Sequence, residues 1–215
     1  MSDTALSRAE LVVRTIAQTA VDNETYFCEL DAVVGDGDFG YSLARGFEIV
    51  LRDWDELGYE DAGGLLKKTA IVLSKRIGGT SGPIWGTAFL RAGGALSATP
   101  DPTGADVIAA LRAAIEGIKQ RGNTDLGDKT LLDALVPAVD ELEKALGEGA
   151  PDALPRAAAT AREAAEATKG MLAQRGRASY TGERSRDSVD AGAVGIAVML
   201  DAVSRAWQQS ELERA

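Results

Sequence analysis

Apolar side chains recur at steps of three and four residues along most of this chain, the spacing that gathers them on one face of an α-helix. Leu6, Leu11, Val12, Ile16 and Ala20 show this repeat near the N-terminus. Clusters of glycine, proline and polar residues interrupt it. The pattern predicts eight helices, near residues 5–30, 39–56, 62–77, 83–98, 104–121, 129–147, 154–174 and 190–210. No strand pattern or internal repeat competes with it, so we expect an all-α protein with one domain over residues 1–215.

The seven connections between these helices alternate in character. The second, fourth and sixth are plain polar turns, at residues 56–61, 97–104 and 147–152. The first, third, fifth and seventh are unusually rich in glycine or charge, at residues 31–38, 78–82, 121–128 and 175–190. Short connections make neighbouring helices antiparallel, so the odd-numbered connections share one end of an up-and-down bundle. The pattern therefore predicts one composite site at that end.

The composition narrows the chemistry of such a site. The chain has no histidine and a formal net charge of −10. It therefore has no Ser-His-Asp triad, no histidine-ligated zinc and no phosphohistidine, and its acidity disfavours non-specific binding to nucleic acid. Because Cys28 is its one cysteine and neither a long apolar run nor a secretion-signal pattern is present, we expect a cytoplasmic location.

The first connection places three carboxylates close together, at Asp31, Asp36 and Asp38, with Gly35 and Gly37 between them. Aspartates at this spacing repel one another unless a positive charge lies among them. Oxygen ligands without histidine or cysteine favour a hard cation such as Mg²⁺. The alternative is a helix cap followed by a solvated acidic turn.

The third connection, Gly78–Gly82, contains Thr80 and Ser81 and opens directly into a predicted helix. Backbone amides, hydroxyls and a helix N-terminus together suit an anion, although a flexible capping turn explains the same residues. The fifth connection adds Gly127–Thr130, a second helix N-terminus with the cation of Lys129 nearby, and capping alone explains it as well.

The seventh connection concentrates positive charge in this acidic chain. Arginine is always protonated, and its planar fork matches phosphate oxygens. The alternative is a structural network with Glu183, Asp187 and the acidic first connection. The four arginines are Arg175, Arg177, Arg184 and Arg186.

A hard cation, an anion cradle and arginines are the parts that stabilise a transferring phosphoryl group. Apolar residues beside them suit a nucleobase, and core packing explains each of these residues equally well. They are Leu43, Ile84, Trp85 and Leu131. The sequence offers no evident general base for an acceptor hydroxyl, so we expect a second protein to present the acceptor.

Four segments carry a family resemblance, at residues 30–40, 78–87, 127–135 and 176–185. They read LDAVVGDGDFG, GGTSGPIWGT, GDKTLLDAL and GRASYTGERS, and Asp190-Ala-Gly-Ala193 follows the last. In order and spacing they resemble the nucleotide-binding subunits of dihydroxyacetone kinases, the DhaL family. The resemblance extends over essentially the whole chain.

This resemblance implies a closed barrel of eight antiparallel amphipathic helices, with a nucleotide, ATP or ADP, capping one rim. It implies that Asp31, Asp36 and Asp38 hold two Mg²⁺ ions, and that Arg177 acts on the transferring phosphoryl group. The positions that match the family's nucleotide contacts are Phe39, Ser42, Leu43, Thr80, Ser81, Ile84, Gly122, Leu131, Arg177, Asp190 and Gly192.

The function implied by the resemblance is a kinase subunit. It transfers the terminal phosphoryl group of ATP to dihydroxyacetone, or a related short ketose, which a separate DhaK-type subunit holds through a histidine. Alternatively, bound ADP is rephosphorylated in place by a phosphotransferase-system protein of the DhaM type. The sequence also leaves open a homodimer and a non-catalytic regulator that binds a transcription factor. An acyl-kinase relative is disfavoured, since it normally carries a further C-terminal domain.

Four positions depart from the family pattern. Family members commonly carry histidine at Phe39, asparagine at Ser42 and methionine at Leu43 and Leu131. Because these positions border the implied nucleotide, its affinity or orientation is expected to differ. The implied metal ligands and Arg177 are retained, so we expect an active protein.

Overall fold

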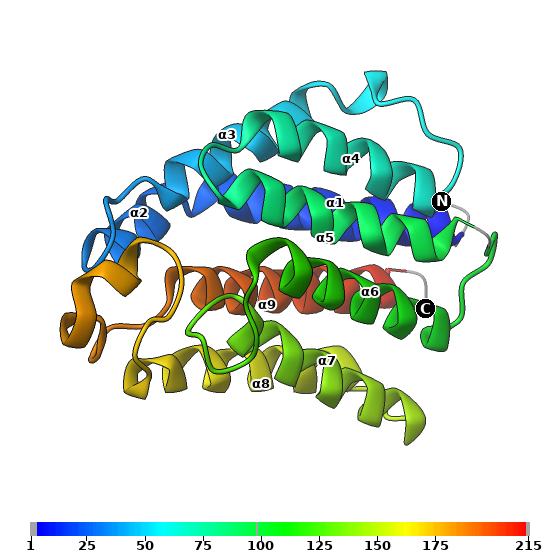
Figure 1. Ribbon diagram of the computed structural model, residues 1–215. Helices are drawn as coiled ribbons and strands as arrows, with labels where there is room; N and C mark the ends of the chain where they lie inside the picture. The colour runs from blue at the N-terminus through cyan, green and yellow to red at the C-terminus, as the bar shows by residue number, and fades with distance from the viewer. Residues whose placement is uncertain (1–3, 98, 214–215) are drawn as a thin grey trace.

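The computed structural model describes residues 4–97 and 99–213, and this part of the chain is helical without a strand. Its α-helices, labelled in Figure 1, are α1 (Ala5–Asp22), α2 (Glu24–Ala32), α3 (Phe39–Arg52), α4 (Ala62–Arg76), α5 (Ser81–Leu96), α6 (Gly104–Gly122), α7 (Leu132–Gly147), α8 (Ala153–Ala167) and α9 (Ala191–Leu212). Short 3-10 helices cover Trp54–Glu56 and Thr168–Gly170, and two 3-10 pieces within Arg177–Ser185 meet at a kink at Gly182. The all-α class predicted from the sequence is confirmed.

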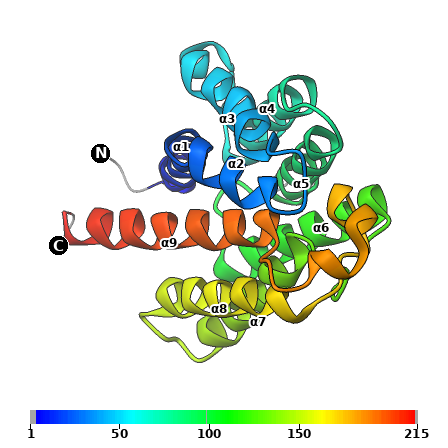
Figure 2. The ribbon, with the colours of Figure 1, turned by 90° about the vertical axis from the view of Figure 1, so that its left-hand side faces the viewer.

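The helices pack mainly against their neighbours in the chain. From α3 to α9 each α-helix contacts the next one, and α1 contacts both α3 and α9. The connections that follow α2, α4, α6 and α8 lie at the end opposite the chain termini (Figure 1). Seen from that end, α4 and α5 point nearly at the viewer, whereas α8 and α9 cross the view (Figure 2). The antiparallel order thus collects the four unusual connections at one end.

Two buried clusters hold this arrangement together. The larger lies among α1–α5, α7, α8 and α9 and includes Phe27, Phe47, Leu65 and Leu73. The smaller lies among α6, α7 and α8, with Ile108, Ile115, Ile118 and Leu142. Leu131 and Leu135 pack against both clusters, so the start of α7 joins them. Within the described residues, no helix has the length and apolar composition that a membrane span requires.

The backbones of α4 and α5 come into direct contact. A Cβ atom added to Gly93 would lie 2.7 Å from the carbonyl oxygen of Gly63, and one added to Gly63 would lie 2.8 Å from that of Gly93. Atoms at these distances overlap, so the crossing requires glycine on both helices. Ser97 adds a bond at this crossing by donating its hydroxyl to the Gly93 carbonyl at 2.6 Å.

The predicted helix over residues 5–30 is wrong in one respect, because the chain breaks at Asn23. The φ and ψ angles of Asn23 are −106° and 17°, and its side-chain amide donates to the Thr19 carbonyl at 2.8 Å. This bond ends α1 and lets α2 leave in a new direction, which buries Phe27. The apolar repeat continues through the break, so periodicity alone does not reveal it.

Three other predicted boundaries move by three residues or more. The helix expected over 39–56 ends at Arg52, and a separate 3-10 helix covers Trp54–Glu56. The helix expected over 154–174 ends at Ala167, where the Thr168 hydroxyl donates to the Ala165 carbonyl at 2.6 Å. The helix expected from residue 129 begins at Leu132 instead, because Lys129 has a positive φ of 61° that an α-helix does not accommodate.

Replacing Gly93 with alanine should destabilise the protein, because the methyl group would meet the Gly63 carbonyl. We expect the free energy of unfolding to fall by about 1–3 kcal/mol, even though alanine favours a helix over glycine by about 1 kcal/mol. Gly94→Ala is the matched control, since a Cβ there meets no atom within 4 Å outside its own helical backbone. Urea unfolding measures both variants, and a Gly93→Ala protein as stable as Gly94→Ala would contradict the close crossing.

Candidate functional site

The first unusual connection brings three carboxylates together. Oxygen atoms of Asp31, Asp36 and Asp38 all lie within 4.8 Å of one another. The Asp31 carboxylate accepts the Asp38 backbone N–H at 3.1 Å, and the Asp31 carbonyl accepts that of Gly35 at 2.6 Å. A side chain at Gly35 would disturb this turn, because a Cβ atom there would lie 2.8 Å from the Asp31 backbone carbonyl oxygen. The oxygen-only donor set and its compactness suit a hard divalent cation.

Arg177 comes from the last connection and lies against this aspartate group. Its guanidinium forms an ion pair with Asp36 and a second with Asp38, the latter at 3.3 Å. All three side chains are about half exposed, so water screens the pairs and a ligand has access to them. The structure thus joins the two connections that are farthest apart in the sequence.

The third connection adjoins the start of α3. A Cβ atom added to Gly78 would lie 3.4 Å from the Ser42 hydroxyl oxygen. Gly79 has a positive φ of 61°, and the chain turns there into α5. Thr80 is exposed and Ser81, the first residue of α5, is partly exposed. Hydroxyls and first-turn amides are therefore presented at the same end as the aspartates.

The fifth connection contacts the first turn of α5, which follows the third connection, and it also contacts the seventh connection. A Cβ atom on Gly122 would lie 3.1 Å from the Ile84 side chain, and one on Gly192 would lie 3.2 Å from that of Leu131. Asp128 accepts the Gln174 N–H through its carbonyl at 3.0 Å and pairs with Arg175 at 3.1 Å. We call residues 31–38, 78–82, 122–131 and 171–192, which these contacts link, the loop end.

The apolar side chains proposed near the nucleotide fall into two groups. Some are buried in the core, and others are partly exposed at its edge. Leu43 is completely buried and Trp85 is nearly so, and both pack within the larger cluster. Phe39, Ile84 and Leu131 are partly exposed at the edges of the clusters. Phe39 packs on Phe27 with ring centroids 6.0 Å apart. Leu43 therefore lies in the core, behind the partly exposed side chains of Phe39, Ile84 and Leu131.

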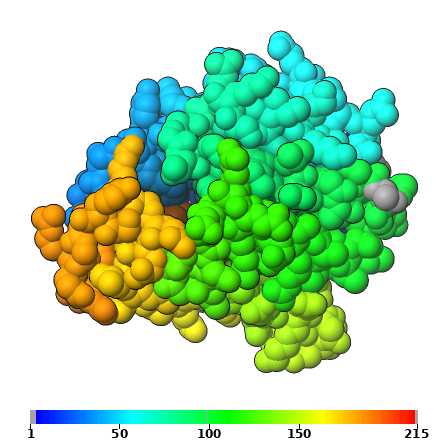
Figure 3. Space-filling view, in the orientation of Figure 1, coloured from blue at the N-terminus to red at the C-terminus, as the bar shows by residue number. Residues whose placement is uncertain are grey.

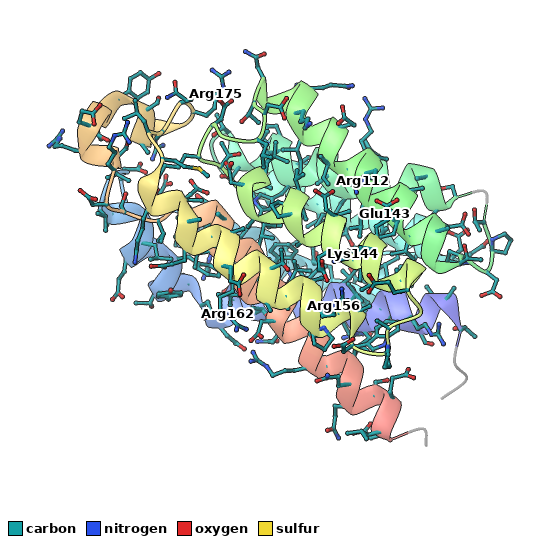
Figure 4. All side chains as sticks on the ribbon, turned by 90° about the horizontal axis from the view of Figure 1, so that it is seen from below. Arg112, Glu143, Lys144, Arg156, Arg162 and Arg175 are labelled. Carbon is teal, nitrogen blue, oxygen red and sulfur yellow. The ribbon has the colours of Figure 1, made fainter. Side chains whose placement is uncertain are left out.

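The arginines of the last connection serve different purposes. Arg175 pairs with Asp128, and Arg186 donates to Glu183 at 2.7 Å and to the Gly170 carbonyl at 3.1 Å. The Arg186–Glu183 pair belongs to the structural network that the sequence left open for this connection, whereas Asp128 was not expected in it. That alternative also included the acidic first connection, and Arg177 pairs there with Asp36 and Asp38. Figure 4 shows Arg175 near one end of the molecule, away from the surface pair of Arg112 with Glu143.

Asp190 occupies the start of α9 and caps it. Its carboxylate accepts the Ala193 N–H at 2.7 Å, and its own N–H donates to the Thr168 hydroxyl at 2.8 Å. Burial of the carboxylate raises the pKa of Asp190 to about 7, and the hydrogen bond from Ala193 opposes that rise. The sequence suggested Asp190 as a nucleotide contact, and the structure also gives it this capping role.

The environment of Lys129 differs most from the sequence-based prediction. The sequence suggested a cation close to a bound anion. The Lys129 side chain is buried, and its ammonium donates to the carbonyls of Met171, Ser185 and Ser188. Burial lowers the pKa of Lys129. Its neighbours in the sequence are ordinary turn residues, so no pattern in the chain marks this lysine as internal.

Comparisons with known proteins show which family the chain resembles. Residues 33–205 match the model of the DAK2 domain family. The chain is 37% identical to the protein of Escherichia coli (strain K12) named PEP-dependent dihydroxyacetone kinase, ADP-binding subunit DhaL, over 86% of this chain and 89% of that one. It is 37% identical to L-erythrulose 1-kinase of Mycolicibacterium smegmatis, covering 89% of this chain and 34% of that protein.

Solved structures give the same result for the fold. The dihydroxyacetone kinase of C. freundii in its native form superposes with a TM-score of 0.75 at 26% identity, over 95% of this chain and 35% of that chain. The same kinase in complex with AMP-PNP and Mg²⁺ superposes with a TM-score of 0.73, also at 26% identity and over the same shares.

The pKa of Asp190 predicts a pH-dependent stability. Folding raises the pKa from about 4 to about 7, so the folded protein binds the proton more tightly than the unfolded chain. The contribution of this group to the free energy of unfolding therefore falls as the pH rises from about 4 to about 7.

Asp190→Asn isolates this effect, because asparagine is also a good N-cap but does not titrate. Its stability relative to the wild type should rise by about 2 kcal/mol between about pH 5 and about pH 8. Urea unfolding at a series of pH values measures the difference, and parallel stability curves would show that Asp190 titrates normally.

Proposed function

This chain belongs to the DAK2 domain family, and on that premise we propose that it is a Mg²⁺-dependent phosphotransferase subunit with its nucleotide at the loop end. The helices would form a closed barrel, and the nucleotide would cap one rim of it. Contacts of α9 with both α8 and α1 support closure. The proposed reaction passes the terminal phosphoryl group of ATP to dihydroxyacetone or a related short ketose.

The observation that carries the proposal is the contact between the aspartate group and Arg177. Residues separated by about 140 positions in the sequence meet on the surface at the loop end. In the space-filling view, the segment around Arg177 lies beside the segment that contains the aspartates (Figure 3). Acidic ligands next to an exposed arginine are what a site for a metal-bound polyphosphate requires.

Asp31, Asp36 and Asp38 would hold two Mg²⁺ ions. Bound there, the ions would neutralise charge on the β- and γ-phosphates. The C. freundii kinase whose complex contains AMP-PNP and Mg²⁺ shares the fold, which supports this assignment. Arg177, whose guanidinium now pairs with Asp36 and Asp38, is close enough to the metal ligands to stabilise charge on the transferring group.

We assign the nucleotide to other residues of the loop end and to residues of α3 and α5 beside it. Thr80 and Ser81 would bind phosphate oxygens, and Gly122 and Gly192 would allow the nucleotide to approach the backbone. Leu43 would lie beneath the partly exposed residues that contact the nucleotide. Asp190 would hold the start of α9 in place. The other proposed contacts are Phe39, Ser42, Ile84 and Leu131.

A partner would present the acceptor, because the chain has no histidine with which to bind a ketone as the family resemblance describes. The E. coli relative and a Listeria innocua relative, 34% identical over 85% of this chain, are each named as one subunit of a PEP-dependent kinase. These names support a DhaK-type partner and a DhaM-type phosphoryl donor. The L-erythrulose 1-kinase supports a short ketose as acceptor.

Asp36→Asn should abolish phosphoryl transfer and leave the helical circular dichroism unchanged. The amide cannot replace a charged metal ligand, so we expect the rate to fall roughly 10³-fold, equivalent to about 4 kcal/mol of lost stabilisation. Asp152→Asn, an exposed change between α7 and α8 at the other end, is the control. Coupled assays with a DhaK-type partner and Mg²⁺·ATP measure both, and full turnover by Asp36→Asn would overturn the metal assignment.

Arg177→Ala should slow the transfer step by roughly 10³-fold, as for arginines that stabilise a transferring phosphoryl group. Nucleotide affinity should change far less, since most of the proposed contacts remain. Arg184→Ala removes an exposed arginine from the same connection and should keep nearly the wild-type rate. Single-turnover rates separate transfer from binding, and equal rates for the two variants would remove Arg177 from the mechanism.

A further inference from the structure

Residues 171–188, which we call the arginine segment, have almost no core of their own. From residue 174 to residue 184 no side chain is buried, and Tyr180 at the tip is 90% exposed. The buried side chains of the segment are Ala173, Ser185 and Ser188, all near its two ends. Burial of apolar side chains therefore does not fix the position of Arg177. Contacts at the two ends of the segment have to fix it instead.

Lys129 joins those two ends from outside the segment. Its ammonium donates to the Met171 carbonyl at 3.2 Å on the incoming side, and to those of Ser185 and, at 2.8 Å, Ser188 on the outgoing side. An ammonium has three N–H donors, so the three carbonyls use all of them. Lys129 is 2% exposed. Because the side chain is buried and all three donors are used, Lys129 is not available to a ligand in solution.

Bonds within the segment support the same junction. The Ser185 hydroxyl accepts the Ala173 N–H at 3.0 Å, and the Ser188 hydroxyl donates to the Ser185 carbonyl at 2.9 Å. The Asp187 N–H donates to the Lys169 carbonyl at 3.0 Å. Lys129 is the member of this junction that comes from the fifth connection, so it also ties the segment to the start of α7.

We propose that Lys129 is a positioning residue, whose side chain joins the two ends of the arginine segment and so holds Arg177 against Asp36 and Asp38. The catalytic part of this inference rests on the proposed function, because it assumes that Arg177 serves phosphoryl transfer. The structural part does not. A lysine suits the role better than an arginine, because one nitrogen reaches three carbonyls that a planar guanidinium does not match.

Hydrogen–deuterium exchange of Lys129→Met tests the structural part without nucleotide or partner. Exchange of amides in the arginine segment should rise at least about tenfold, because three carbonyls, two of them in buried hydrogen bonds, lose their donor, while α1 and α3–α5 exchange as in the wild type. Lys169→Met is the matched control: it removes a charge from the same neighbourhood, and its half-exposed side chain pairs with Glu166. The control should exchange like the wild type.

Unchanged exchange in the segment of Lys129→Met, or an equal rise in Lys169→Met, would overturn the proposal. Lys129→Arg keeps the charge and provides the measurement if Lys129→Met does not fold, with a smaller rise confined to the same segment expected. Loss of the whole fold in both Lys129 variants would also contradict the proposal, because the effect would then not be local to the segment.

Kinetics test the catalytic part. Displacement of Arg177 in Lys129→Met should lower kcat on the order of 10²-fold with a much smaller change in KM for the nucleotide. The Lys129→Met/Arg177→Ala double variant should be no slower than Arg177→Ala alone, because Lys129 acts through Arg177. Additive losses would contradict this. A different result is also informative, in which exchange rises only in the arginine segment of Lys129→Met while the wild type is inactive. That result would reject the proposed function and leave the structural role of Lys129 standing.

Discussion

Three carboxylates lie within 4.8 Å of one another at the loop end, and a cation beside them reduces their repulsion. In the structure the Arg177 guanidinium supplies that charge through its pairs with Asp36 and Asp38. Arg177, Asp36 and Asp38 are about half exposed, so water screens the pairs and weakens their hold on the two connections. The electrostatic pairing therefore depends on how the helices and the junction at Lys129 bring the two connections together.

The fold supplies that arrangement in two steps. Antiparallel packing of successive helices places alternate connections at one end. Because α9 packs against α1 and α2, the last connection lies near the first one. Local bonds then set the details. Asp31 fixes the turn that contains Asp36 and Asp38, and Lys129 binds the ends of the arginine segment. Three carboxylates and one guanidinium leave this group net negative on a chain of net charge −10, so a polyphosphate would bind there only with cations.

The sequence predicts the helical class and the grouping of the loops well, because both depend on periodicity and on the order of short connections. It does not predict the break at Asn23, where the apolar repeat runs on while a single side-chain bond ends the helix. Composition and spacing do not distinguish Arg177 from Arg175 and Arg186, since all three are arginines in one polar stretch, and only the family resemblance singles out Arg177. The burial of Lys129 depends on carbonyls more than 40 residues away, which no local pattern records.

The central claim is that the aspartates of one connection and the nucleotide phosphates share metal ions at the loop end. Anomalous diffraction from crystals grown with Mn²⁺ and a non-hydrolysable ATP analogue tests it most directly. We expect manganese peaks within about 2.2 Å of the carboxylate oxygens of Asp31, Asp36 and Asp38 and of phosphate oxygens, with Arg177 beside the phosphates. Manganese and nucleotide bound together elsewhere on the protein, with no peak at the aspartates, would contradict the account.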